Sequence, residues 1–363
     1  MLEILFWLVF TVVAFFISGT RVFLQGQDLS VFDRSIESSM WSGEPSEQHY
    51  NSVELIVGLV EARKKNKYRK PQLLERRISM DEWGTRADMS GIRLVDVNAN
   101  GVPAEWVLAE GADPGRRLLY IHGGAFIVGS PRSHRAITTT LSRITNASVL
   151  AIDYRLAPEN SRVACIEDCQ AAYKWVLDNG PDDQVGAPDA FFIAGDSAGG
   201  NLTLMTIAWA RDKGLTAVNA AIALSPLTDS TFSSPSIRTN VETDHMLGPL
   251  IRPLTKMPQM MHAWISLIVN RVKPNDPRIS PVFGDLSDLP PTLVHASEAE
   301  VLFDDARRWV NKAQDAGTNA TLQTWPHVLH VWHIFGEEMP EAKEAFENIR
   351  RFIRRYEPGA SVI

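Results

Sequence analysis

Ala190-Phe191-Phe192-Ile193-Ala194-Gly195-Asp196-Ser197-Ala198-Gly199-Gly200 joins an apolar run to a Gly-x-Ser-x-Gly turn. The apolar run is typical of a buried strand, and residues 201–209 read as a helix. A Gly-x-Ser-x-Gly turn between a strand and a helix is a nucleophile elbow. Gly195 and Gly199 permit a tight turn that a residue with a Cβ would resist. The pattern therefore predicts an exposed Ser197 hydroxyl beside the first amides of a helix.

A second glycine motif, His122-Gly123-Gly124-Ala125-Phe126, follows the apolar run 118–121. Successive glycines let backbone N–H groups approach a ligand closely, and in acyl transfer such groups hold the oxyanion of the tetrahedral intermediate. The alternative is an ordinary glycine-rich turn between a strand and a helix. We expect the amides of Gly123, Gly124 and Ala198 to form an oxyanion hole.

Together with the segment Asp153-Tyr154-Arg155-Leu156-Ala157-Pro158-Glu159, these motifs resemble the hormone-sensitive-lipase-like branch (family IV) of the α/β-hydrolases. This group includes bacterial esterases and is related to arylacetamide deacetylases. With acid and histidine segments near the C-terminus, the resemblance covers about residues 90–355. It implies an α/β fold in which a mostly parallel central sheet is flanked by helices and carries a helical cap. It also implies a serine esterase without a cofactor.

The chain departs from the usual family pattern at two places. Ala125 replaces the third glycine of the family's His-Gly-Gly-Gly, which we expect to be tolerated if its φ is negative. The family's Asp-Pro-Leu acid motif appears as Glu300-Val301-Leu302, so the acid would be a glutamate.

A serine nucleophile needs a base, and α/β-hydrolases supply an acid and then a histidine after the serine. The resemblance places the catalytic histidine at His330, with His327 and His333 as alternatives. These three histidines could also suggest a metal site. No carboxylate or cysteine pattern accompanies them, so we predict none.

The acid follows the strand expected over 292–296. The family motif has a leucine two residues after the acid, which selects Glu300 and leaves Glu298 as the alternative. Asp304 and Asp305 would fall in the first turn of the next helix, where carboxylates are favoured by the helix dipole. The predicted triad is therefore Ser197, His330 and Glu300.

The length and composition fit one large α/β domain with a cap. The chain has 363 residues, of which 45% are hydrophobic and 22% charged. Its net charge of −7 argues against a nucleic-acid partner. The two cysteines, Cys165 and Cys169, are four apart on an expected helix and predict buried free thiols rather than a disulfide scaffold.

Apolar runs alternate with helical patterns along the chain, which predicts a doubly wound, mostly parallel sheet. A hairpin is expected around the turn Asn100-Gly101. The expected organisation is an apolar N-terminal segment at 1–22, an N-terminal cap region at 23–90, a catalytic domain at 91–228 and 276–363, and a second cap insertion at 229–275.

The N-terminal segment allows three interpretations. Residues 4–17 are almost wholly apolar, and residues 1–20 could just span a bilayer. We expect a membrane-associated protein with an N-terminal apolar helix, and a cytoplasmic protein as the alternative. The segment could also be a helix that covers the active site or packs on a second copy in a homodimer, or a cleaved signal.

These observations predict a serine carboxylesterase that hydrolyses short- to medium-chain acyl esters through an acyl-enzyme. An arylamide deacetylase or amidase, or a lipase, is the alternative on the same fold. A non-catalytic protein that binds small molecules is the alternative of a different class.

Overall fold

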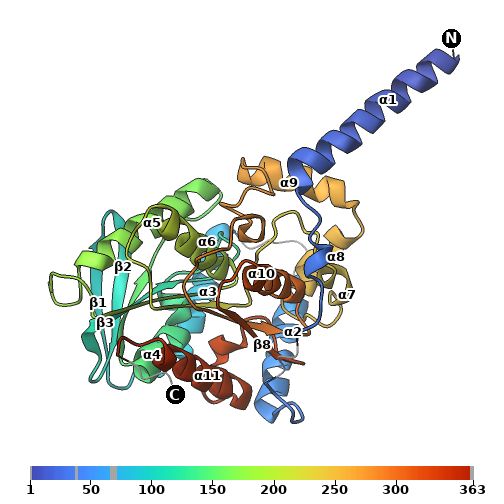
Figure 1. The fold of residues 1–363 in the computed structure, drawn as a ribbon. Coiled ribbons are helices and arrows are strands. Elements are labelled where there is room, and N and C mark those ends of the chain that lie inside the picture. Colours follow the sequence, from blue (N-terminus) through green and yellow to red (C-terminus); the bar gives the residue numbers. More distant parts are fainter. Residues whose placement is uncertain (1, 37–39, 66–71, 360–363) are drawn as a thin grey trace.

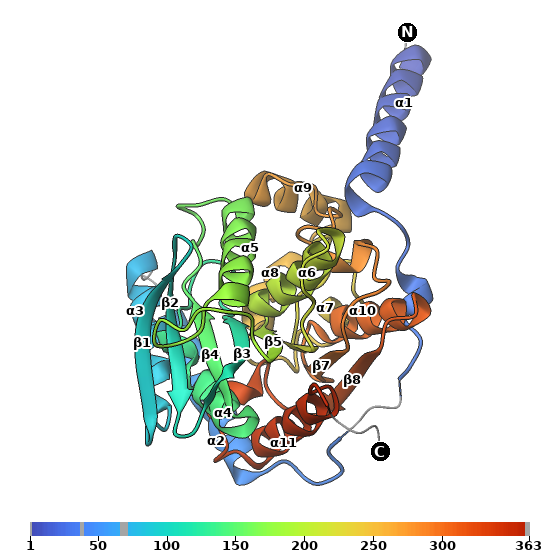
Figure 2. The ribbon, with the colours of Figure 1, turned by 60° about the vertical axis from the view of Figure 1, so that its left-hand side comes forward.

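The computed structural model describes residues 2–36, 40–65 and 72–359. Its centre is an eight-stranded sheet in the order β1-β2-β4-β3-β5-β6-β7-β8, with β1 at one edge and β8 at the other (Figures 1 and 2). The strands are β1 Ile92–Ala99, β2 Val102–Ala109, β3 Asp113–Ile121, β4 Ala147–Ile152, β5 Ala190–Asp196, β6 Ala220–Leu224, β7 Thr292–Ser297 and β8 Ala320–Trp325.

The sheet is mostly parallel, as predicted. Strands β1 and β2 form the expected antiparallel hairpin, and β2 is also antiparallel to β4. All the remaining neighbours from β4 to β8 are parallel. Strands β4 to β7 are continuous runs of buried residues, as is the second half of β3, because helices cover both faces of the sheet.

Helices form a layer on each face of the sheet. One apolar core lies between the sheet and helices α5, α6 and α10, and a second lies between the sheet and helices α4 and α11. Figure 2 shows α4 and α11 together on their side of the strands. The α-helices are α1 Leu2–Thr20, α2 Glu47–Lys65, α3 Leu73–Asp81, α4 Arg135–Thr145, α5 Arg162–Asp178, α6 Ala198–Asp212, α7 Ser236–Thr239, α8 Gly248–Thr255, α9 Gln259–Asn270, α10 Phe303–Asp315 and α11 Pro340–Arg355.

The predicted site residues all follow the carboxyl ends of parallel strands. His122 follows β3, Ser197 follows β5, Glu300 follows β7, and His330 follows β8. These ends meet at one edge of a parallel sheet, which is where α/β folds bind ligands. The topology therefore gathers segments as far apart in the sequence as His122 and His330.

The expected second cap insertion, 229–275, contains helices α7, α8 and α9. Cys165 and Cys169 lie on α5 as buried free thiols, as predicted. The division of the chain into cap and catalytic segments stays a prediction.

The prediction of a membrane-associated N-terminus is wrong. Among the described residues, no helix is long and apolar enough to cross a bilayer. Helix α1 has 19 residues, and its last three are Ser18, Gly19 and Thr20. Figure 1 shows α1 standing away from the body, so it does not cover the predicted site.

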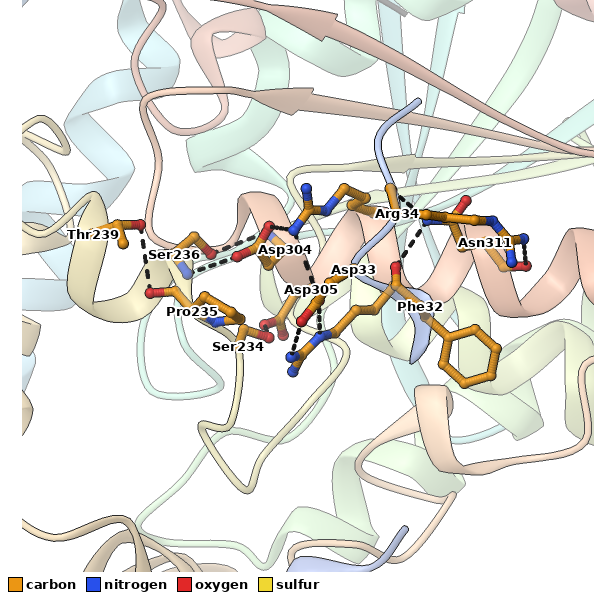
Figure 3. A network of polar contacts seen from close by, with 12 residues as sticks. Phe32, Asp33, Arg34, Ser234, Pro235, Ser236, Thr239, Asp304, Asp305 and Asn311 are labelled. Atoms are coloured by element: carbon orange, nitrogen blue, oxygen red, sulfur yellow. Dashed lines mark hydrogen bonds and ion pairs between the residues drawn. The ribbon is translucent and has the colours of Figure 1, made fainter. Parts of the chain in front are cut away.

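Helix α10 anchors the segment that follows α1 (Figure 3). The Arg308 guanidinium donates to both carboxylate oxygens of Asp33, at 2.6 and 2.8 Å. The Asn311 side chain donates to the backbone carbonyls of Phe32 and Arg34. Farther along the helix, Arg34 pairs with Asp315. One helix thus holds residues 32–34 against the body of the fold.

The first turn of α10 also binds the segment 228–236, which follows β6. The Asp305 carboxylate accepts hydrogen bonds from the backbone amides of Thr228 and Asp229. It also accepts from the Ser234 hydroxyl, which lies beside it in Figure 3. Asp304 accepts from the Ser236 amide. Burial, together with the nearby Asp229 carboxylate, raises the pKa of Asp305 to about 7. Both carboxylates therefore have the structural role that the sequence predicted.

Two substitutions on this anchor should differ in effect. Arg308→Met removes the nearer of two guanidiniums at Asp33, in a site where the Arg308 side chain is only 5% exposed, and leaves Arg307 at 3.7 Å. We expect the free energy of unfolding to fall by about 2 kcal/mol. Arg34→Met removes a pair whose side chains are both nearly half exposed, so it should lower the free energy of unfolding less than Arg308→Met does. Chemical denaturation of the two variants measures the difference, and equal losses would contradict it.

Candidate active site

The turn after β5 has the backbone of a nucleophile elbow. Ser197 has φ 52° and ψ −113°, which is strained for a residue with a side chain. Its amide donates to the Leu224 carbonyl at 2.7 Å, so the neighbouring strand fixes the turn. A Cβ at Gly199 would overlap the carbonyl oxygens of Ile121 and His122. Glycine is therefore required where helix α6 starts against the end of β3.

Ser197, His330 and Glu300 form one hydrogen-bonded chain. The Nε2 atom of His330 lies 2.9 Å from the Ser197 hydroxyl, and its Nδ1 atom lies 2.5 Å from a Glu300 carboxylate oxygen. The second oxygen of Glu300 accepts from the Ser297 amide at 3.0 Å. If Glu300 is ionised, Nδ1 carries the proton and Nε2 is left to accept from the serine.

Both partners of this pair are buried and electrostatically coupled. Burial alone would lower the pKa of His330, but the hydrogen bond and the charge of Glu300 raise it above its ordinary value. Burial raises the pKa of Glu300, while the His330 contact opposes that rise. The arrangement therefore favours a histidine that readily takes up a proton beside a serine hydroxyl.

The alternative site residues point to other partners. Glu298 accepts from the Thr324 hydroxyl at 2.7 Å. His327 lies 3.4 Å from a Glu341 oxygen, and His333 lies 3.0 Å from His295. His330 is thus the histidine at the serine, and Glu300 is the acid that contacts it.

The loop after β3 has an unusual backbone. Gly124, Ala125 and Phe126 have φ values of 112°, 55° and 64°. The φ of Ala125 is therefore positive, so the condition under which we expected alanine to be tolerated here is not met. Left-handed backbone at two consecutive non-glycine residues is costly, so surrounding contacts must hold the loop in place.

The structure also differs from the sequence prediction at Gly123. Its amide donates to a carboxylate oxygen of Asp196 at 2.9 Å, so its one hydrogen is already used inside the protein. Within the described ranges, the Gly124 and Ala125 amides donate to no protein group. The loop therefore leaves the backbone amides of Gly124 and Ala125, rather than that of Gly123, available to a ligand.

Sequence reasoning missed the buried group that orients this loop. Asp196 also accepts from the Tyr120 hydroxyl at 2.6 Å and lies 3.3 Å from Nε2 of His134. Burial raises the pKa of Asp196, but His134 and Tyr120 outweigh burial and lower it. Asp196 is thus an ionised anchor directly before the elbow. In the sequence, Asp196 occupies the first variable position of the Gly-x-Ser-x-Gly motif, and the motif itself does not specify a residue there.

Comparison with known proteins agrees with this geometry. Residues 118–334 match a family described as the alpha/beta hydrolase fold. An acetyl-hydrolase of Streptomyces hygroscopicus is 36% identical over 280 residues, which cover 77% of this chain and 89% of that protein. An esterase of Acinetobacter venetianus is 32% identical and covers 72% of this chain and 82% of that protein.

Solved structures give the same result. An esterase from the bacterial hormone-sensitive lipase family superposes with a TM-score of 0.73 at 31% identity, covering 87% of this chain and all of that one. The structure of EstE5 superposes with a TM-score of 0.73 at 34% identity, over 86% of this chain and 99% of that one. The chain therefore belongs to the α/β-hydrolase family, in its hormone-sensitive-lipase-like branch, and is a carboxylic ester hydrolase.

Proposed function

We propose that Ser197, His330 and Glu300 are the catalytic triad of this esterase. The observation that carries the proposal is the hydrogen-bonded chain from Glu300 through His330 to a serine on a strained elbow. Ser197 attacks the ester carbonyl while His330 takes its proton at Nε2. His330 then protonates the leaving alcohol and afterwards activates the water that releases the acid. Glu300 holds the imidazole in the required tautomer and stabilises its charged form.

We further propose that the amides of Gly124, Ala125 and Ala198 bind the oxyanion. The sequence suggested the Gly123 amide as an oxyanion donor. This amide instead donates to the buried Asp196 carboxylate and so orients the loop. Ala198 is the first residue of α6, whose N-terminal amides and dipole favour negative charge. Backbone donors of this kind stabilise the charge that develops in the transition state.

Short- to medium-chain acyl esters are the proposed substrates. The support is the likeness to a Streptomyces protein named as an acetyl-hydrolase. The test is hydrolysis of p-nitrophenyl esters from acetate to palmitate beside the Ser197→Ala variant. Turnover that peaks at short chains and disappears in the variant agrees with the proposal. Turnover that peaks at palmitate would replace it with a lipase. A homodimer stays a prediction.

The pH dependence of turnover should report the triad histidine. His330 must be neutral to accept the proton, and Glu300 raises its pKa above the ordinary 6.5. We therefore expect kcat/KM to fall with decreasing pH along a limb whose midpoint lies above 6.5. Profiles of kcat/KM between pH 5 and 9 measure this midpoint. A midpoint well below 6.5 would contradict the assignment of Glu300 as an ionised partner.

A further inference from the structure

Arg162, the first residue of helix α5, is a buried cation with no role in the steps above. It is only 5% exposed. Its Nη1 atom has no hydrogen-bond partner, and no carboxylate in the described ranges pairs with it. Burial lowers its pKa to about 10, so the guanidinium remains charged at neutral pH. Burying an unbalanced charge is unfavourable. Packing alone therefore does not explain an arginine at this position.

The contacts of Arg162 join two parts of the proposed active site. Its Cζ atom lies 3.1 Å from the centroid of the Phe126 ring, and Phe126 directly follows the oxyanion loop residue Ala125. Its Nη2 atom donates to the Asn201 side chain at 2.7 Å. Asn201 lies in the first turn of α6, four residues after Ser197. Arg162 thus contacts both segments that carry the proposed oxyanion donors.

Other contacts also hold each of these two segments, the start of α6 and the loop after β3. The Asn201 amide group donates to the backbone carbonyls of Leu227 and Ile279, at 2.7 and 2.9 Å. On the outer side of the loop, Arg77 donates to the Ile127 carbonyl at 2.9 Å. The left-handed backbone of the loop is therefore held between Arg77 outside and Arg162 inside.

We propose that Arg162 is a positioning residue for the oxyanion of the acyl-transfer step, an inference that rests on the proposed function. In that step a bond forms between the Ser197 oxygen and the ester carbon. The carbonyl π electrons move to the carbonyl oxygen, and the serine proton moves to His330. Arg162 acts through Phe126 and Asn201. It keeps the loop amides and the Ala198 amide in the relative positions that a single oxyanion needs. Its charge, which no carboxylate balances, favours the negative oxygen over the neutral carbonyl.

The test replaces the charge and keeps the length of the side chain. We expect Arg162→Met to lower kcat about tenfold and to change KM less than twofold, because the effect belongs to the transition state. Binding of a trifluoromethyl ketone, which forms a tetrahedral oxyanion with the serine, should weaken by the same factor. Arg162→Lys keeps the charge and should recover part of the loss. The thermal unfolding temperature of Arg162→Met should change little, because the lost hydrogen bond to Asn201 is offset by the removal of a buried charge that no carboxylate in the described ranges balances.

Lys174→Met is the matched control. Lys174 lies on the same helix and over an aromatic ring, with its Nζ atom 5.5 Å from the centroid of Trp209. This variant should keep the kcat and the ketone affinity of the unmodified protein.

Three results would overturn the inference. Unchanged kcat and ketone affinity in Arg162→Met would show that the charge does not act on the oxyanion. A lower unfolding temperature, with substrate and ketone binding weakened equally, would reduce Arg162 to a packing role. If the unmodified protein neither hydrolyses esters nor reacts with a fluorophosphonate, the proposed function fails and this inference fails with it. Normal turnover by the unmodified protein separates the first two results from the third.

Discussion

Replacing Ser197 with alanine should lower kcat on p-nitrophenyl esters by about 10⁴- to 10⁶-fold and leave the fold intact. The loss is large because the serine oxygen is the nucleophile, and no other hydroxyl occupies its place within 2.9 Å of His330 Nε2 in the described part of the chain. Circular dichroism and thermal unfolding of the variant provide the control for folding.

Ser225 is a matched second control for this substitution. Its hydroxyl accepts from the Val331 amide at 3.2 Å, so it contacts the residue after the triad histidine and not the histidine ring. We expect Ser225→Ala to retain most of the turnover. Substantial turnover by Ser197→Ala would contradict the nucleophile assignment.

Replacing Glu300 with glutamine should lower kcat by about 10³- to 10⁴-fold. Glutamine has nearly the same shape, but its amide would donate to His330 Nδ1 where the carboxylate accepts. The imidazole would then carry its proton on Nε2 and could no longer accept the serine proton. Steady-state kinetics on a short-chain ester measure the effect.

Glu298→Gln is the control for this second prediction. Glu298 has the same chemistry two residues away, but it contacts Thr324 rather than the histidine. Its substitution should change kcat less than about threefold, since it leaves the triad untouched. If Glu298→Gln proved the damaging change and Glu300→Gln the mild one, the acid would have to be reassigned.

Much of the fold could be predicted because its signals are local. The apolar run before Gly195 and the glycines after it specify a strand, a sharp turn and a helix within about twenty residues. The same holds for the hairpin at Asn100-Gly101. The alternation of such units then leaves few topologies other than a parallel sheet with helices on both faces.

The Gly-x-Ser-x-Gly motif pointed to Ser197, whereas His330 and Glu300 were selected by the resemblance to the family. The structure brings the three selected residues into hydrogen-bond contact and turns Glu298, His327 and His333 elsewhere. Parallel strands bring their carboxyl ends to one edge of the sheet, which explains this proximity, and the catalytic roles of the three residues stay a proposal.

The remaining features depend on contacts that no local pattern records. Asp196 and His134 are 62 positions apart, and nothing around His134 marks it as the partner of a buried carboxylate. That network decides that the Gly123 amide faces inward. Arg162 likewise reads as an ordinary helix start until Phe126 and Asn201 are seen against it. The expectation of a membrane-associated N-terminus also failed, since no helix among the described residues is long and apolar enough to cross a bilayer.

The most direct test of the account is to map the covalent adduct of a fluorophosphonate by mass spectrometry. The account predicts one adduct, on Ser197, formed by the unmodified protein and absent from Ser197→Ala. Adduct formation should slow strongly in Glu300→Gln and not in Glu298→Gln. An adduct on another residue, or ester turnover that persists while Ser197 is fully labelled, would contradict the proposed mechanism.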